Sequence, residues 1–150
     1  MRTTRVVVDP SEQAAKAGAF TLFRIVVGVI MIAHGWLKLM DYGGWHAQVV
    51  QLGIPVPDVS AALGLAGELL GGLGLLLGCL TRIAAFGVAA TMAVAIVTVH
   101  IDNGLLMQNN GFEFPLLLLC SALYFLAAGA GPLSVDALIG LAARRRAKLA

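Results

Sequence analysis

Four stretches of this chain are almost continuously apolar, and short polar segments separate them. An α-helix rises about 1.5 Å per residue, so about 20 residues cross the roughly 30 Å hydrocarbon core of a bilayer. The pattern predicts an all-α integral membrane protein in which residues 19–132 form a four-helix bundle. The predicted spans cover residues 20–40, 60–80, 83–101 and 113–129.

The polar segments beside the spans predict short helices and turns at the membrane surface. Paired glycines at 43–44 and two prolines within 53–58 prevent a continuous helix between the first two spans, so we expect a short interfacial helix and a turn there. The segment from Asp9 to Glu12 predicts another interfacial helix before the first span. Ser60 is positioned to cap the start of the second span.

Glycines recur at helical spacing in the second span. Gly67 and Gly71, and again Gly74 and Gly78, lie four residues apart. Small residues at this spacing let membrane helices approach each other closely. The second and third spans are joined by a very short turn at 81–82, and such a turn predicts antiparallel neighbours.

Arginine and lysine are concentrated outside the spans. They lie in the tail 1–18, at the turn containing Arg82, and in the segment 133–150, which we interpret as a basic amphipathic helix, whereas residues 102–111 have none. Because cytoplasmic segments carry the excess of basic residues, we expect both termini in the cytoplasm. The tail has no apolar stretch followed by a small-residue cleavage site, so we expect the first span to remain as an anchor.

Composition narrows the class of protein further. With 59% hydrophobic residues, 12% charged residues and a mean hydropathy of +0.91, the chain lies outside the range of soluble globular domains. The net charge is only +2, and we expect no nucleic acid partner. Cys79 and Cys120 form no Cys-x-x-Cys pair, which argues against a thioredoxin-like redox centre.

Ionisable residues nevertheless occur in every apolar stretch. Arg24 and His34 lie in the first, Glu68 in the second, His100 at the end of the third and Glu113 at the start of the fourth. A charged group at the centre of a span costs about 2.5–3.5 kcal/mol by insertion scales, so such groups persist where they pair, line water or bind a ligand. We expect these five residues to form a ligand-binding site, with His34 and Glu68, at similar depth in the outer half, as the candidate catalytic pair. The alternative is that Glu68 pairs with His34 or Arg24 only to hold the bundle together.

Three ligand classes match this set of residues. Histidine and carboxylate are ligands for a divalent metal, although no single helix has HxxxH or ExxH spacing. His34 and His100 on facing helices are suitable for bis-histidine haem. A quinone headgroup needs a hydrogen-bond donor such as His34 and a carboxylate such as Glu68 that exchanges protons. We favour quinone, with haem and metal as alternatives.

Short motifs occur along most of the chain, from Phe20 to Leu138. They are Arg24-x-x-x-Gly28, His34-Gly35-x-x-Lys38, Gly67-Glu68-x-x-Gly71-Gly72, Leu80-Thr81-Arg82, Asn110-Gly111-x-Glu113 and Gly129-x-Gly131-x-x-Ser134-x-Asp136. In their order and spacing, these motifs resemble the DoxX family of bacterial membrane proteins. The resemblance implies a four-helix protein of the bacterial cytoplasmic membrane, and some DoxX relatives are subunits of a thiosulfate:quinone oxidoreductase while others are linked to redox or thiol homeostasis.

These observations lead to one working hypothesis and two alternatives. The hypothesis is a DoxX-like membrane subunit that binds a quinone-type lipid and supports a redox complex, such as a sulfur-linked, thiosulfate:quinone oxidoreductase-like complex. Its partners are then membrane lipid and either further copies of this chain or a redox protein. The alternatives are a non-catalytic scaffold or assembly protein for redox or oxidative-stress enzymes, and a small-solute or metal transporter that works as a homo-oligomer.

Overall fold

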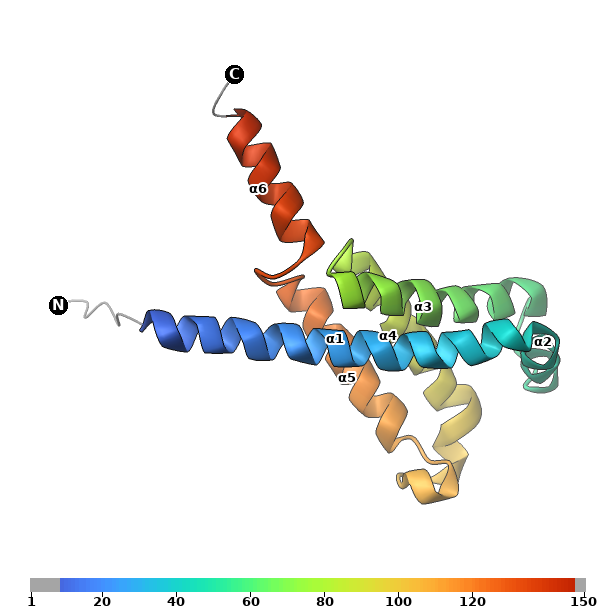
Figure 1. Cartoon of the computed structure of the whole chain (residues 1–150). Helices are drawn as coiled ribbons and strands as arrows, with labels where there is room; N and C mark the ends of the chain where they lie inside the picture. The colour runs from blue at the N-terminus through green and yellow to red at the C-terminus, as the bar shows by residue number, and fades with distance from the viewer. Residues whose placement is uncertain (1–8, 148–150) are drawn as a thin grey trace, which may run out of the picture.

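The computed structural model of the chain describes residues 9–147, and its regular structure over this range is entirely helical (Figure 1), which confirms the all-α prediction. A π-helical turn at Ile96–His100 and 3₁₀ turns at Ile101–Asn103 and Met107–Asn109 follow the fourth α-helix. The α-helices are α1 (Pro10–Met40), α2 (Tyr42–Gln51), α3 (Pro57–Leu77), α4 (Thr81–Ala95), α5 (Glu113–Ala128) and α6 (Val135–Ala147).

Three helical segments in the described range are long and apolar enough to cross a membrane. They are Pro10–Met40, Pro57–Leu77 and Thr81–Asn103, the last including the π and 3₁₀ turns. The fourth apolar helix, α5, has 16 residues. The apolar helices are compatible with a membrane helical bundle, while the count of four spans stays a prediction.

The first helix begins earlier than its apolar run. Asp9 caps it by accepting a hydrogen bond from the backbone N–H of Ser11 at 3.0 Å, and Pro10 occupies the first turn, where its missing N–H costs nothing. The helix then continues without a break through Phe20 to Met40. The prediction of a separate interfacial helix before the first span is therefore wrong. The rest of the predicted tail, residues 1–8, lies outside the described residues.

The connection between the first two long helices contains the short helix that the sequence predicts, α2, but α3 starts three residues before the predicted cap. Pro57 forms the first turn of α3. The Ser60 hydroxyl donates a hydrogen bond to the Pro55 carbonyl at 2.6 Å, so it does not cap the helix. The predicted capping role of Ser60 is therefore wrong: Ser60 lies in the first turn of α3, and its hydroxyl binds the connection before the helix.

Glycines allow α1 and α3 to pack in backbone contact. A Cβ atom added at Gly28 would lie 2.7 Å from the Leu76 nitrogen, and one added at Gly35 would lie 2.7 Å from the Leu69 nitrogen. These contacts also show that the two helices are antiparallel. On the other face of α3, a Cβ at Gly71 would lie 2.9 Å from a methyl of Val88 on α4. The predicted close helix packing is confirmed.

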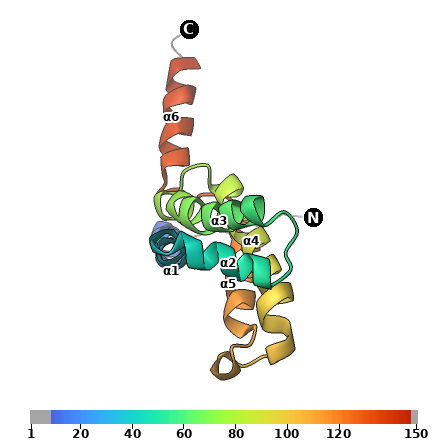
Figure 2. The ribbon, with the colours of Figure 1, turned by 90° about the vertical axis from the view of Figure 1, so that its right-hand side faces the viewer.

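The long helices form two antiparallel pairs that cross each other. Helix α1 packs along α3, α4 packs along α5, and α3 also contacts α4, while α1 crosses α5 and contacts it through side chains such as Phe20 with Tyr124 and His34 with Phe114 (Figure 1). Helix α6 projects away from both pairs in either view (Figure 2). The core lies between the pairs and is lined by Val27, Met31, Leu75, Ala85, Val88, Met92, Leu118, Ala122 and Phe125.

Candidate functional site

Arg24 is buried at one end of the α1–α3 pair, with 2% of its surface exposed. Its Nε donates a hydrogen bond to the Leu75 carbonyl at 2.8 Å, Nη2 donates to the Leu133 carbonyl at 2.8 Å, and Nη1 donates to the Ala130 carbonyl. Leu75 is in the last turn of α3, where carbonyls lack partners within the helix. Arg24 therefore joins α1 and α3 to the segment before α6.

Asp136 completes this junction from the start of α6. Its carboxylate accepts hydrogen bonds from the backbone N–H of Leu80 at 2.8 Å and of Thr81 at 3.0 Å, and from the Thr81 hydroxyl at 2.9 Å. Burial raises the pKa of Asp136, but these hydrogen bonds and the charge of Arg24 outweigh it, so the pKa lies below its usual range. We call Arg24, Thr81 and Asp136 the anchor cluster.

A second group of polar side chains lies toward the other end of the same helix pair. Glu68 on α3 is 3% exposed, and its Oε1 lies 2.5 Å from Nζ of Lys38 on α1. The Lys38 ammonium also lies 3.9 Å from the centre of a Trp45 ring on α2. Among the described residues, Oε2 of Glu68 is buried and has no hydrogen-bond partner. We call Glu68, Lys38 and Trp45 the Glu68 cluster.

Helix packing explains why these three residues meet. Gly35 lets α1 approach the backbone of α3 at Leu69, so a side chain one turn further along α1 reaches the neighbouring Glu68. Trp45 is fixed by a hydrogen bond from its ring N–H to the Ala61 carbonyl at 2.9 Å, which holds α2 against α3. The Glu68 cluster is therefore held by three helices.

His34 lies one helical turn before Lys38, on an exposed part of α1. Its ring centre is 6.0 Å from that of Phe114 at the start of α5. Within the described part of the chain, its ring makes no hydrogen bond to Glu68, whose partner is Lys38. The predicted pairing of Glu68 with His34 or Arg24 is therefore corrected to a pairing with Lys38.

His100 and Glu113 hold the connection between α4 and α5. Nδ1 of His100 lies 2.8 Å from the Asn110 carbonyl, and the Glu113 carboxylate accepts a hydrogen bond from the Met107 backbone N–H at 2.6 Å. Both contacts shape this polar turn. Residues 9–147 contain no group of three or more histidine, cysteine, aspartate and glutamate side chains placed to hold a metal ion.

The five residues selected from the sequence are thus divided among three places. Arg24 belongs to the anchor cluster, Glu68 to the Glu68 cluster, and His100 and Glu113 to the turn before α5, while His34 lies between the last two. Sequence reasoning missed Lys38 and Trp45 as site residues. A signal for Lys38 was present, because it lies four residues after His34 on the same face of an apolar helix.

Comparison with known proteins identifies relatives of this chain. The family model named DoxX matches residues 19–101. Two relatives from Haemophilus influenzae, both named "Uncharacterized protein", are 32% and 34% identical. Their alignments cover 63% and 75% of this chain and 66% and 84% of the relatives.

A third relative carries a name that refers to chemistry. It is a Bacillus subtilis protein named "Putative oxidoreductase CatD", and it is 31% identical over 77% of this chain and 82% of its own length. No solved structure matches the chain.

Proposed function

Because this chain belongs to the DoxX family of membrane proteins, we propose that it binds a quinone-type lipid at the Glu68 cluster and serves as the membrane subunit of a redox complex. A partner protein in this complex supplies the electrons, and a sulfur-linked, thiosulfate:quinone oxidoreductase-like partner is the form we favour. The name of the Bacillus subtilis relative supports a redox role.

The observation that carries the proposal is the free oxygen of Glu68. A buried polar atom without a hydrogen-bond partner is rare, and leaving one costs about 1–3 kcal/mol. In a membrane span, bulk water does not offset that cost. Oε2 of Glu68 is such an atom, in a side chain whose Oε1 is already paired with Lys38. A ligand that donates a hydrogen bond to Oε2 removes the cost.

The residues present fit a quinone-type headgroup. An oxidised headgroup offers carbonyl acceptors and a reduced one offers hydroxyl donors. Lys38 is a donor, Oε2 of Glu68 is an acceptor, and His34, one helical turn from Lys38, has both functions when its ring is neutral. When bound, the quinone supplies reversible two-electron, two-proton chemistry.

In this proposal the chain binds the headgroup and manages protons. Lys38 balances the charge of Glu68 through Oε1 and leaves Oε2 available. Glu68 holds or releases a proton at Oε2. Trp45 covers the Lys38 ammonium, which limits access of water to the ion pair. His34, one helical turn from Lys38 on α1, is the second group that gives or takes a proton.

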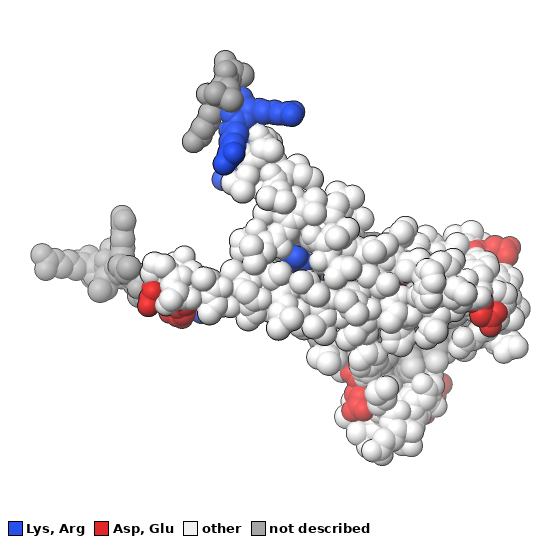
Figure 3. All heavy atoms as spheres, in the orientation of Figure 1, with Lys and Arg blue, Asp and Glu red and all other residues white. Residues whose placement is uncertain are grey.

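We also propose that both termini face the cytoplasm of a bacterial cell. The anchor cluster brings the turn beside Arg82 and the segment before the arginines of α6 to the same end of the molecule. Figure 3 shows basic side chains gathered on α6, and acidic side chains at the N-terminal end of α1 as well as at the opposite end of the molecule. This distribution of charge supports the positive-inside orientation.

A specific observation also favours the scaffold alternative. Glu68 and Lys38 join α1 to α3, and a purely structural ion pair makes that contact without a ligand. In that case Glu68→Gln leaves Lys38 without its partner and destabilises the fold by about 3–5 kcal/mol. In the quinone proposal, the main loss is of the bound ligand.

The experiment measures quinone and thermal stability on the same preparations. We expect quinone to co-purify with the parent protein, and its occupancy to fall by about tenfold in Glu68→Gln, as expected for the loss of one charge-assisted hydrogen bond. The matched control is Asp58→Asn, which removes the exposed carboxylate that lies 2.8 Å from His46. Equal quinone occupancy in Glu68→Gln and in the parent contradicts the proposal. If the parent carries no quinone and Glu68→Gln has a lower melting temperature than the parent, the scaffold alternative is favoured. A Soret band in the parent identifies haem instead.

A further inference from the structure

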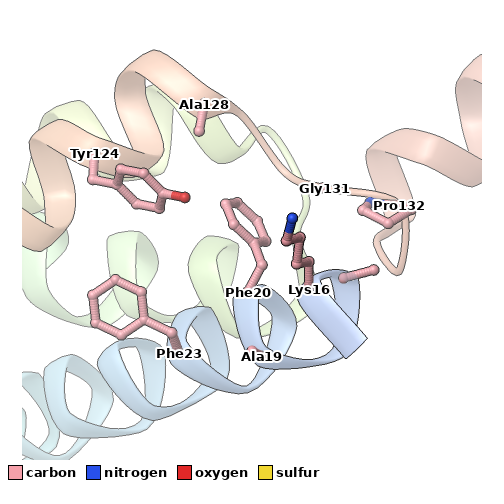
Figure 4. Close-up of a pocket in the computed structure, with 9 residues that line it drawn as sticks. Lys16, Ala19, Phe20, Phe23, Tyr124, Ala128, Gly131 and Pro132 are labelled. Carbon is pink, nitrogen blue, oxygen red and sulfur yellow. The ribbon is translucent and has the colours of Figure 1, made fainter. Parts of the chain in front are cut away.

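A groove of about 720 Å³ lies between the N-terminal half of α1 and the C-terminal end of α5. Three aromatic side chains form its wall: the ring centres of Phe20 and Phe23 lie 5.7 and 6.2 Å from that of Tyr124. Figure 4 shows Phe20 between Tyr124 and Lys16, with the Lys16 ammonium near Gly131. The groove therefore has an aromatic part and a cationic end.

The backbone at Gly131 shapes the cationic end. This glycine has φ of +75°, and a Cβ atom added to it would lie 2.7 Å from the Phe20 ring. Only glycine combines this left-handed conformation with such a close approach. The segment after α5 can therefore bend around Phe20 and form one side of the groove.

The position of Lys16 along α1 indicates at which level of the membrane the groove lies. Lys16 lies four residues before Phe20, where the apolar run begins, which corresponds to about 6 Å along the helix. In a spanning α1, Lys16 is at headgroup level and Phe23 is among the acyl chains. Lys16 also pairs with Glu12 at 2.6 Å, but both side chains are exposed, and an ammonium has three donors. It can therefore contact a second anion.

We propose that this groove binds one anionic phospholipid, with its phosphate at Lys16 and an acyl chain along Phe20, Phe23 and Tyr124. The cationic end selects an anion, and Arg82 adds positive charge at the same end of the molecule. A quinone has no anionic group for Lys16. The groove lies far along α1 from the Glu68 cluster, so the inference is independent of the proposed quinone site.

Native mass spectrometry of the full-length protein with added lipid tests the proposal. The probes are phosphatidylglycerol and phosphatidylcholine with identical acyl chains. We expect the first phosphatidylglycerol to bind about fivefold or more tightly than the first phosphatidylcholine, which is the preference expected from one lysine near a phosphate. Lys16→Gln should remove this preference. Ala128→Trp, which fills the groove, should abolish tight binding of the first molecule of either lipid.

Two neighbouring changes serve as controls. Ala127→Trp adds the same bulk beside the groove but outside its lining, and Arg144→Gln removes a basic group from α6. Both should keep the preference of the parent. If Ala128→Trp does not fold, Ala19→Trp fills the groove from α1 instead. Equal binding of the two lipids by the parent, unchanged binding in a folded groove-filling variant, or displacement of phosphatidylglycerol by quinone would overturn the proposal.

Discussion

Two charged side chains of α1 lie within apolar surroundings, and their contacts differ in kind. The guanidinium nitrogens of Arg24 donate to backbone carbonyls from two other segments, so every nitrogen has a partner. Lys38 pairs with Glu68 but leaves one carboxylate oxygen without a partner. The first arrangement is satisfied internally and is structural. The second leaves a polar atom available to a ligand.

Arg24→Gln tests the structural role of the first side chain. The shorter amide cannot serve the carbonyls of Leu75, Ala130 and Leu133 together, and a hydrogen bond from a charged group contributes about 1.5–3 kcal/mol. We expect a loss of about 3 kcal/mol or more, measured as a lower melting temperature in detergent. The control is Arg82→Gln, which removes an exposed hydrogen bond to the Ala127 carbonyl. Equal melting of both variants would contradict this role.

At this scale the sequence predicted which residues are unusual but not how they pair. Glu68, His34 and Arg24 are conspicuous because each is polar in an apolar stretch. Their contacts depend on the crossing of α1 and α3, which is fixed where Gly35 meets the backbone of Leu69. Counting residues along each span gives the depth of a side chain but not the rotation of one helix against the other. The count therefore placed Glu68 beside His34 and missed Lys38.

At the scale of elements, the apolar pattern predicted the helices better than their ends. Apart from Gly18, good helix formers fill the chain between Glu12 and Phe20, so α1 is not interrupted and includes the segment expected to form a separate helix. Pro57 starts α3 before Ser60 because proline suits a first helical turn. Local capping chemistry therefore decided both boundaries.

The glycine contacts between helices predict a steep cost for added side chains. A Cβ atom at Gly72 would lie 2.7 Å from the Ile32 backbone nitrogen, which cannot move aside. We expect Gly72→Ala to destabilise the protein by about 1–3 kcal/mol, as overpacking does. Gly18→Ala is the control, because nothing lies within 4 Å of its added Cβ, and it should be neutral or stabilising by about 0.4–1 kcal/mol. Thermal unfolding in detergent measures both.

The same reasoning extends to the other face of α3. Gly71→Leu places bulk against Val88 and the Ala84 carbonyl of α4, both within 3.0 Å of an added Cβ. We expect a lower melting temperature by the overpacking cost of about 1–3 kcal/mol. A variant that melts like the parent would show that this face of α3 does not pack on α4 in the membrane.

The contact between α6 and the start of α4 should depend on pH. The pKa of Asp136 is lowered in the folded state, so the ionised carboxylate stabilises the fold at pH values above its unfolded pKa of about 4. This stabilisation is lost as the pH falls through the lowered pKa. We expect Asp136→Asn to be less stable than the parent at neutral pH and the difference to shrink in acid. A constant difference between pH 7 and pH 3 would contradict the linkage.

At the scale of the whole molecule, the long helices form two antiparallel pairs that cross around one core, an arrangement compatible with the helical bundle that the sequence predicts. The apolar pattern gives the helices, but the crossing depends on which faces carry glycine and which carry bulky residues such as Phe125 and Met31. The turn beside Arg82 and the segment that leads to the arginines of α6 both lie at the end that contains the anchor cluster.

Cysteine labelling in intact cells tests the orientation. In a background with Cys79→Ala and Cys120→Ala, single cysteines replace Glu12, Arg146 or Asn109 in turn. Because basic segments stay in the cytoplasm, we expect an impermeant thiol reagent to label only the Asn109→Cys variant. All three should be labelled after the cells are permeabilised, which controls for expression and access. Labelling of Glu12→Cys or Arg146→Cys in intact cells would contradict the cytoplasmic position of that terminus.

The anchor cluster also sets an order of events during biosynthesis. The farthest carbonyls that Arg24 uses belong to residues 106 and 109 positions later in the chain. At a ribosomal rate of about 5–20 residues per second, these carbonyls are synthesised roughly 5–20 s after Arg24. Until then only the Leu75 carbonyl, 51 positions after Arg24, is available among its partners in the folded protein. A nascent chain that stops before Ala130 therefore lacks two of the three carbonyls that Arg24 binds, and they do not offset the cost of an arginine in a span, which is about 2.5–3.5 kcal/mol at the span centre.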